Sequence, residues 1–318
     1  MKWKKLGRIF NPTEYKLANN CFAFAKSPQA LVFDDFVRIY FSAVEKEKTG
    51  KYLSHVLFVD FDKRFRRIKK ISDKTVISLG KLGSFDEHGI FPMNVVRDDN
   101  KILAYTTGWN RKVSVSVDSS IGLAISEDNG LTFKKYSNGP ILTASLYEPF
   151  LVGDAFVTKF KNEYHMWYIY GSKWIIDTKE DEPQRVYKIR HAISNDGISW
   201  KREGRHIIAD KLNKNECQAL PTVIKFDNKY HMFFCYRHTT DFRKNPERSY
   251  KIGYAYSTDL ENWIRDDSLF SFVGEPQAWD ANMQCYPHVF NYRDTLYLLY
   301  NGNDFGREGF GLAVLANN

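Results

Sequence analysis

The chain has 318 residues, of which 43% are hydrophobic and 26% charged, a composition typical of a folded globular protein and not of a disordered one. No apolar run approaches the ~18 residues that a membrane helix needs, and no apolar segment follows the positively charged start, Met1–Phe10, as it would in a secretory signal. We therefore expect no membrane span and a location in the cytoplasm.

The four cysteines and the net charge of +8 narrow the choice of partners. Cys21, Cys217, Cys235 and Cys285 form no Cys-x-x-Cys pair, so we expect reduced thiols, no metal and no cofactor. The basic residues are dispersed, and their densest run, Lys63–Lys70, is typical of an exposed edge strand. We therefore favour an anionic or phosphorylated substrate over nucleic acid.

The elements predicted along the chain are strands. The first covers residues 3–10, and five segments with a strand, a polar turn and a second strand follow at 33–40, 97–103, 159–166, 225–232 and 290–297. Equivalent positions in these segments are 62 to 67 residues apart, so five copies fill the chain. An internal repeat of this kind determines the fold.

A second motif recurs after three of the five hairpins, in Ala124–Phe133, Ala192–Trp200 and Ala255–Trp263. Each is an apolar strand, a Ser-x-Asp turn and an aromatic residue that opens another strand; aspartate favours such turns by accepting hydrogen bonds from nearby backbone. Together with an inner strand that starts near a proline (Pro28, Pro92, Pro221 and Pro287), every repeat has four strands. Four strands without helical periodicity are typical of a β-propeller blade.

The two ends of the chain provide a test of this interpretation. The fifth repeat stops after its third strand, Gly311–Ala316, and the first strand resembles the fourth strand of the third repeat, Trp200–Ile207. We therefore predict an all-β, five-bladed β-propeller of one domain over residues 1–318, with the N-terminal strand closing the last blade, in preference to two domains.

The turn sequences Ser194–Trp200 and Ser257–Trp263 resemble those of the five-bladed β-propeller glycoside hydrolase superfamily, which includes arabinanases, xylosidases, invertases, levansucrases and relatives that are mannoside phosphorylases. The resemblance covers the whole chain as repeat architecture. It implies a carbohydrate-active enzyme with acidic residues at the starts of the innermost strands. One carboxyl group would donate a proton to the leaving oxygen, and a second would activate water or attack the sugar.

The resemblance implies a role for two carboxylates above all. Asp154, in the segment that resembles the Arg-Asp-Pro of invertases, would stabilise the transition state or bind a sugar hydroxyl; the alternative is a turn aspartate. Glu216, in a pair with Cys217 that resembles the Glu-Cys of invertases, would be the general acid; the alternative is a solvated loop glutamate.

Further candidates lie ahead of the inner strands on the same expected rim. Asp86 and Glu87 are possible catalytic carboxylates, and the possible substrate ligands are His88, Glu148, Trp279, Asp280 and Asn282. A propeller also uses many aromatic residues between blades, so a core position for Trp279 stays open.

The first repeat departs from the hydrolase pattern, since it has Lys26-Ser27-Pro28 where the hydrolases carry an aspartate that acts as base or nucleophile. A phosphorylase or transferase needs no such base, and Lys26, Arg237, His238 and Arg243 would suit an anion such as phosphate. We expect glycosidic cleavage by hydrolysis, with phosphorolysis or glycosyl transfer, a non-catalytic glycan-binding propeller and a protein-interaction propeller as the alternatives.

Overall fold

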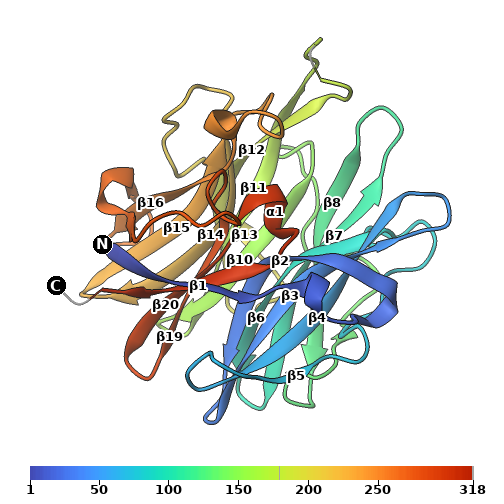
Figure 1. The fold of residues 1–318 in the computed structure, drawn as a ribbon. Helices are drawn as coiled ribbons and strands as arrows, with labels where there is room; N and C mark the ends of the chain where they lie inside the picture. The colour runs from blue at the N-terminus through green and yellow to red at the C-terminus, as the bar shows by residue number, and fades with distance from the viewer. Residues whose placement is uncertain (179, 317–318) are drawn as a thin grey trace.

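The computed structural model describes residues 1–178 and 180–316 and consists almost entirely of antiparallel sheet (Figure 1). The one short α-helix in this part of the chain is α1 (Asn303–Gly306), and single 3-10 turns cover Pro12–Glu14, Ala18–Asn20, Pro246–Arg248 and Asp267–Leu269. None of the described helices is long and apolar enough to span a membrane.

Four sheets contain the strands. The largest joins β2 (Cys21–Val32), β3 (Phe36–Lys46), β4 (Tyr52–Asp62) and β5 (Ile68–Ile71) to β6 (Gly89–Asp98), β7 (Lys101–Arg111), β8 (Val117–Ser126) and β9 (Lys134–Lys135). Two sheets contain β10 (Val152–Phe160), β11 (Glu163–Ile175), β12 (Gln184–Ser194) and β13 (Lys201–Arg202), and β14 (Cys217–Phe226), β15 (Lys229–Arg237), β16 (Lys251–Ser257) and β17 (Ile264–Arg265). The last contains β18 (Ser271–Val273), β1 (Lys2–Phe10), β21 (Phe310–Leu315), β20 (Thr295–Asn301) and β19 (Cys285–Tyr292), in that order.

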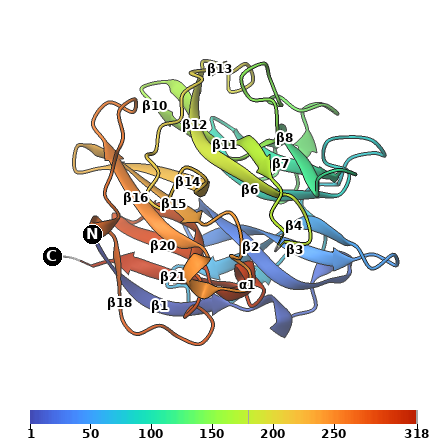
Figure 2. The ribbon, with the colours of Figure 1, turned by 90° about the horizontal axis from the view of Figure 1, so that it is seen from above.

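The repeat seen in the sequence is a repeat in space. Each of the five predicted hairpins is a hairpin, and the equivalent positions pair across it as Val32 with Val37, Arg97 with Ile102, Lys159 with Tyr164, Lys225 with Tyr230 and Phe290 with Tyr297. The strands that lead these hairpins, β2, β6, β10, β14 and β19, each contact the next, and β19 contacts β2. In Figure 2 the sheets follow one another in chain order around the molecule.

The Ser-x-Asp turns connect neighbouring repeats. In the turn that starts at Ser126, the hydroxyl of Ser126 donates to Asp128 and accepts from the N–H of Gly130, and the Tyr40 hydroxyl of the preceding repeat donates to the Gly130 carbonyl at 2.7 Å. Gly130 has a φ of +77°, and a Cβ there would lie 2.1 Å from the Tyr40 oxygen. Tyr105 and Gly197 repeat this contact one unit further on.

The N-terminal strand completes the last sheet, as the sequence predicted. Strand β1 pairs antiparallel with β21, Trp3 opposite Leu315, and Trp3 is fully buried. The structure adds β18, which pairs parallel with β1 on its other side, so β1 is not the edge. The basic run, by contrast, includes a true edge strand: β5 pairs only with β4 and exposes Lys69 and Lys70.

The first and last repeats are also joined near the centre of the molecule. The fully buried amide of Asn301 donates to the carbonyls of Ala25 and Gly309 at 2.8 and 2.7 Å, and its oxygen accepts the N–H of Ser27 at 2.8 Å. Since all three bonds use groups that water cannot reach, leaving any of them unpaired is costly. Both β1 and Asn301 therefore join the start of the chain to its last repeat.

Deletion of residues 1–11 should destabilise the protein strongly, because it exposes the edge of β21 and removes the packing of Trp3. Losing a buried tryptophan alone costs about 3–5 kcal/mol, so we expect the melting temperature to fall by about 10 °C or more, with aggregation. Circular dichroism melts measure this. Arg8→Ala, which breaks only an exposed pair with Glu308, is the control. An unchanged melting temperature in the truncated chain would contradict the role given to β1.

Candidate active site

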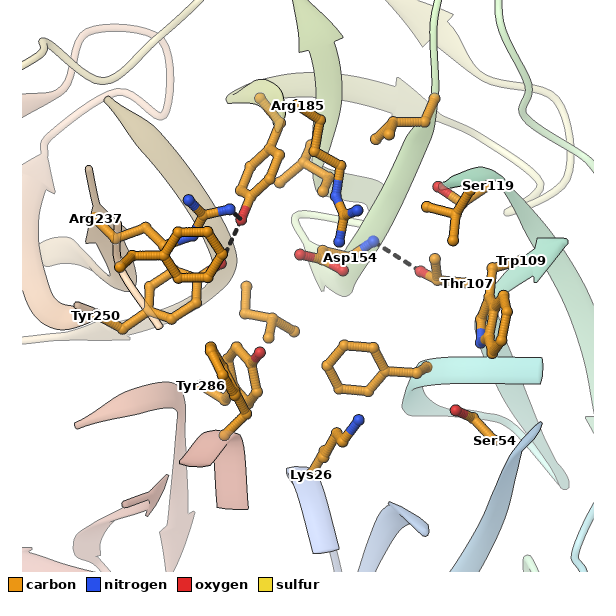
Figure 3. A pocket seen from close by; sticks show the side chains of 18 of the residues that line it. Lys26, Ser54, Thr107, Trp109, Ser119, Asp154, Arg185, Arg237, Tyr250 and Tyr286 are labelled. Atoms are coloured by element: carbon orange, nitrogen blue, oxygen red, sulfur yellow. Dashed lines mark hydrogen bonds between the residues drawn. The ribbon is translucent and has the colours of Figure 1, made fainter. Parts of the chain in front are cut away.

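A cavity of about 400 Å³ lies where the inner strands meet (Figure 3). Its walls come from the inner strands of all five repeats and, in some repeats, also from the end of the second strand, the start of the third strand and the loop between them. The inner strands contribute Lys26, Phe91, Asp154, Leu220 and Tyr286. Trp109 and Arg237 end second strands, and Arg185 and Tyr187 begin a third.

The inner strands share a backbone feature that turns these residues toward the cavity. Each has a shift in pairing register at this point, which is the mark of a β-bulge. Ser27, Asp154, Leu220 and Tyr286 have φ between +48° and +56°, and Phe91 precedes a cis proline. A left-handed leucine or tyrosine is uncommon and is tolerated where the surrounding structure fixes it, as at functional sites.

Asp154 is the one carboxylate among the described residues that line the cavity. Its backbone N–H donates to Thr107 Oγ1 at 2.7 Å, which fixes the bulge. Burial raises the pKa of the Asp154 carboxyl to about 7, and the charge of Arg185 and a backbone N–H at Leu220 oppose that rise only in part. This carboxyl therefore keeps its proton to a higher pH than an exposed aspartate does.

Three arginines gather on one wall of the cavity. Arg237 is buried, and its guanidinium carbon lies 3.5 Å from the centre of the Phe242 ring. The guanidinium donates to the carbonyls of His238 and Thr239 and to the Tyr187 hydroxyl. Arg185 and Arg243 make only long hydrogen bonds of 3.4 Å, to Ser116 and Gln184. Among the described residues none of the three forms an ion pair with a carboxylate, whereas seven of the fourteen other arginines do.

Of the residues predicted from the sequence, the structure brings Asp154, Lys26, Arg237 and Arg243 together in the cavity. His88 does not line the cavity, but its ring stacks on that of the lining residue Trp109, with the ring centroids 6.0 Å apart. The others are outside the cavity lining, namely Asp86, Glu87, Glu148, Glu216, His238, Trp279, Asp280 and Asn282.

Four of these carboxylates have the same structural environment. Each is 0 or 1% exposed and pairs with a cation on the fourth strand of its own repeat: Asp86 with Lys135, Glu148 with Arg202, Glu216 with Arg265 and Asp280 with Lys5. In the strand register these cations lie opposite Ala124, Ala192, Ala255 and Ala313. We call these four contacts the outer-strand ion pairs. The carboxylates recur at equivalent positions ahead of the inner strands, which is why the sequence pattern predicted them as site residues.

Glu216 shows how completely such a carboxylate is used. One oxygen accepts from Arg265 at 2.6 Å and from Gln218 at 3.0 Å, and the other accepts the backbone N–H groups of Lys211 and Leu212, both at 2.9 Å. A carboxylate with four donors and no exposed surface has no free lone pair or proton for a substrate. The expectation that Glu216 is the general acid has no support in this geometry.

The remaining predicted residues also have local partners. Glu87 accepts the N–H of Gly83 at 2.9 Å, and Trp279 packs on Tyr300 with ring centroids 5.3 Å apart. Asn282 is exposed, and the backbone N–H of His238 donates to Arg248. Trp279 is thus a core residue, the alternative that the sequence left open.

Sequence reasoning missed Arg185, because it searched only the starts of inner strands and the ends of second strands. Arg185 and Tyr187 are alternate residues at the start of β12 and both face the cavity, as do Val117 and Ser119 at the start of β8. The third-strand starts could therefore have been aligned across repeats in the same way. No group of three or more metal-ligating side chains gathers within residues 1–178 and 180–316.

Comparison with known proteins places this geometry in context. No family model matches the chain. The uncharacterised protein Rv1502 of Mycobacterium tuberculosis (strain ATCC 25618 / H37Rv) is 33% identical over 318 residues, the full length of both chains. A β-1,2-mannobiose phosphorylase of Thermoanaerobacter sp. (strain X514) is 28% identical over 178 residues, covering 52% of this chain and 54% of the relative.

Solved structures agree on the fold. A glycoside hydrolase superposes with a TM-score of 0.75 at 16% identity, covering 99% of this chain and 92% of the other. The β-1,2-mannobiose phosphorylase of Listeria innocua, in complex with β-1,2-mannobiose, gives a TM-score of 0.67 at 13% identity, covering 96% and 94%. The chain therefore has the fold of the propeller glycoside hydrolases and mannoside phosphorylases.

Glu216→Ala should reduce stability, because it leaves Arg265 partly unpaired in the interior. Removing one partner of a buried pair costs about 3–5 kcal/mol, and thermal or urea unfolding measures it. Glu308→Ala, which breaks an exposed pair with Arg8, should cost under about 1 kcal/mol. If Glu216→Ala kept its stability and lost only activity, the glutamate would be a catalytic residue after all.

Proposed function

We propose that this chain, which belongs to the same family as the protein Rv1502 of Mycobacterium tuberculosis, is a carbohydrate-active enzyme that cleaves a glycosidic bond and transfers the sugar to inorganic phosphate. The observation that carries the proposal is the composition of the cavity: one carboxyl group faces Lys26, Arg185, Arg237 and Arg243. A hydrolase would need a second carboxylate to activate water, and the described cavity lining supplies none.

The proposed architecture is one domain of five propeller blades over residues 1–318. The ring of contacts from β2 through β6, β10, β14 and β19 back to β2 supports it. The single parallel pair of Ser54 with Gly89 is then a contact between two adjacent blades.

Asp154 is the proposed general acid. Its raised pKa, near 7, suits a group that must carry a proton at neutral pH and release it as the bond breaks. The proton passes to the glycosidic oxygen while the bond from C1 to that oxygen breaks, and the bonding electrons go to the oxygen. Asp154 then regains a proton from solvent.

Phosphate is the proposed nucleophile, and the arginines would hold it. A phosphate oxygen bonds to C1, so the products are a sugar 1-phosphate and the freed hydroxyl compound. Arg185 and Arg243 have donors free for the phosphate oxygens, whereas the donors of Arg237 are mostly occupied by protein groups. We assign Arg237 a fixed positive charge behind the site rather than a direct contact.

The relative named as a β-1,2-mannobiose phosphorylase supports an oligosaccharide substrate for this chain. We therefore propose that β-mannosides be tested first as substrates. Trp109 offers an aromatic face in the cavity wall. The four cysteines are free and buried, in keeping with our proposal of a cytoplasmic location, where phosphorolysis would retain the sugar as a phosphate ester.

Asp154→Asn should lower the rate of cleavage by about 10²–10⁴-fold, because an amide cannot donate the proton. The loss should be smaller for aryl glycosides with acidic phenols, which need little protonation. In the wild type, activity should fall as the pH rises through about 7, where Asp154 loses its proton. Initial rates across pH for a series of aryl glycosides measure both. Asp34→Asn, in an exposed turn, is the control. A loss independent of the leaving group would show that Asp154 acts on the sugar instead.

Phosphate should determine the product. With a cleavable oligosaccharide and inorganic phosphate, mass spectrometry should detect a sugar 1-phosphate, and Arg185→Gln should raise the KM for phosphate by about tenfold or more. Arg64→Gln, on the exposed β4–β5 turn, should leave that KM unchanged. Free reducing sugar formed at a rate indifferent to phosphate would mean hydrolysis, and no turnover with any glycoside would favour a glycan-binding protein.

A further inference from the structure

Lys26 is a charged side chain of the cavity that the proposed reaction does not use. It lies within the inner strand of the first repeat, β2, at a shift in pairing register and next to the left-handed Ser27. Its ammonium lies 4.6 Å from the centre of the Phe24 ring and 5.4 Å from that of Phe91. No carboxylate in the described part of the chain pairs with it, although thirteen other lysine and arginine side chains within the same residues pair at 3.2 Å or less.

The environment of Lys26 is apolar, and this has an electrostatic consequence. Burial lowers the pKa of the Lys26 ammonium to about 8, with only the thiol of Cys285 acting in the opposite direction. The two aromatic faces return part of the lost hydration energy. A protonated amine without a counter-ion in such a place is poorly stabilised, so an anion that enters the cavity gains by pairing with it.

Lys26 is separate from the arginines. In Figure 3 its ammonium points into the cavity from the side opposite Arg185, and Asp154 lies between them. The guanidinium carbons of Arg237 and Arg243 lie 3.5 and 4.2 Å from the centre of the same ring, that of Phe242, so these two are close neighbours. Lys26 lies instead over the rings of Phe24 and Phe91. A single phosphate held by the arginines would therefore leave Lys26 unpaired.

We propose that Lys26 forms a second anion-binding position, which takes a phosphate ester or carboxylate carried by the sugar substrate itself. The inference rests on the proposed function for the division of labour: the arginine wall holds the acceptor phosphate, Asp154 faces the bond that breaks, and Lys26 selects the sugar. The substrate class is then an acidic or phosphorylated glycoside. A neutral one would leave the Lys26 charge without a partner.

Equilibrium binding tests this without any turnover. Isothermal titration would compare mannose with mannose 6-phosphate, mannose 1-phosphate and mannuronate, and separately with inorganic phosphate. The wild type should bind at least one anionic sugar ten- to hundredfold more tightly than mannose. Comparison of the two phosphate esters with mannuronate shows whether the preferred charge is a phosphate ester or a carboxylate. Lys26→Met should abolish that preference, and Lys26→Arg should retain most of it.

The phosphate arm separates the two sites. Arg185→Gln should weaken binding of inorganic phosphate, and Lys26→Met should not. Lys48→Met, in an exposed turn, is the control for loss of a lysine charge. The proposal is overturned if Lys26→Met weakens mannose and the anionic sugars equally, if it weakens phosphate as much as Arg185→Gln, or if the wild type shows no preference for an anionic sugar. Because these experiments measure binding and not turnover, they test the role of Lys26 even if the chain proves not to catalyse phosphorolysis.

Discussion

The outer-strand ion pairs are the interaction on which the arrangement of this molecule depends. Three of the four outer strands that carry the cations, β9, β13 and β17, are only two residues long, so backbone hydrogen bonds alone hold them weakly. A buried carboxylate that accepts from a cation on such a strand fixes its register, because a slip by one residue would leave both charges unpaired in the interior. The pairs thus contribute specificity more than net stability. In the last sheet the same contact, Lys5 with Asp280, holds the N-terminal strand in place.

Because these four carboxylates are paired with cations inside their own repeats, they are not available as catalytic groups in the cavity. Asp86, Glu148, Glu216 and Asp280 precede the inner strands, where the sequence resemblance predicted catalytic or substrate-binding residues, yet each is already bound to a cation of its own repeat. What remains at the centre is Asp154 among unpaired positive side chains. The cavity is therefore electrostatically suited to anions, in agreement with the sign of the net charge.

The features that could be predicted from the sequence are those that residues close together in the chain encode. Hairpins, Ser-x-Asp turns and the strand starts are encoded within about ten residues, so the repeat, the N-terminal strand and the position of Asp154 could be found in the sequence. The partner of Glu216 is Arg265, 49 residues away, and nothing near the glutamate reveals whether it faces the cavity or the outer strand. Arg185 was missed for a related reason: its strand position is clear only once the third strands are seen to reach the cavity.

The pairing of β1 with β21 has a consequence for how the chain acquires this structure. Its partner residues are separated by about 300 positions, as Arg8 and Gly311 are. At about 5–20 residues per second on the ribosome, β1 waits roughly 15–60 s before its partner strand is made. Throughout that time Trp3 has no core to enter and β1 is an unpaired strand. Lys2 and Lys4, both exposed in the final fold, flank the tryptophan and would oppose association between nascent chains during the delay.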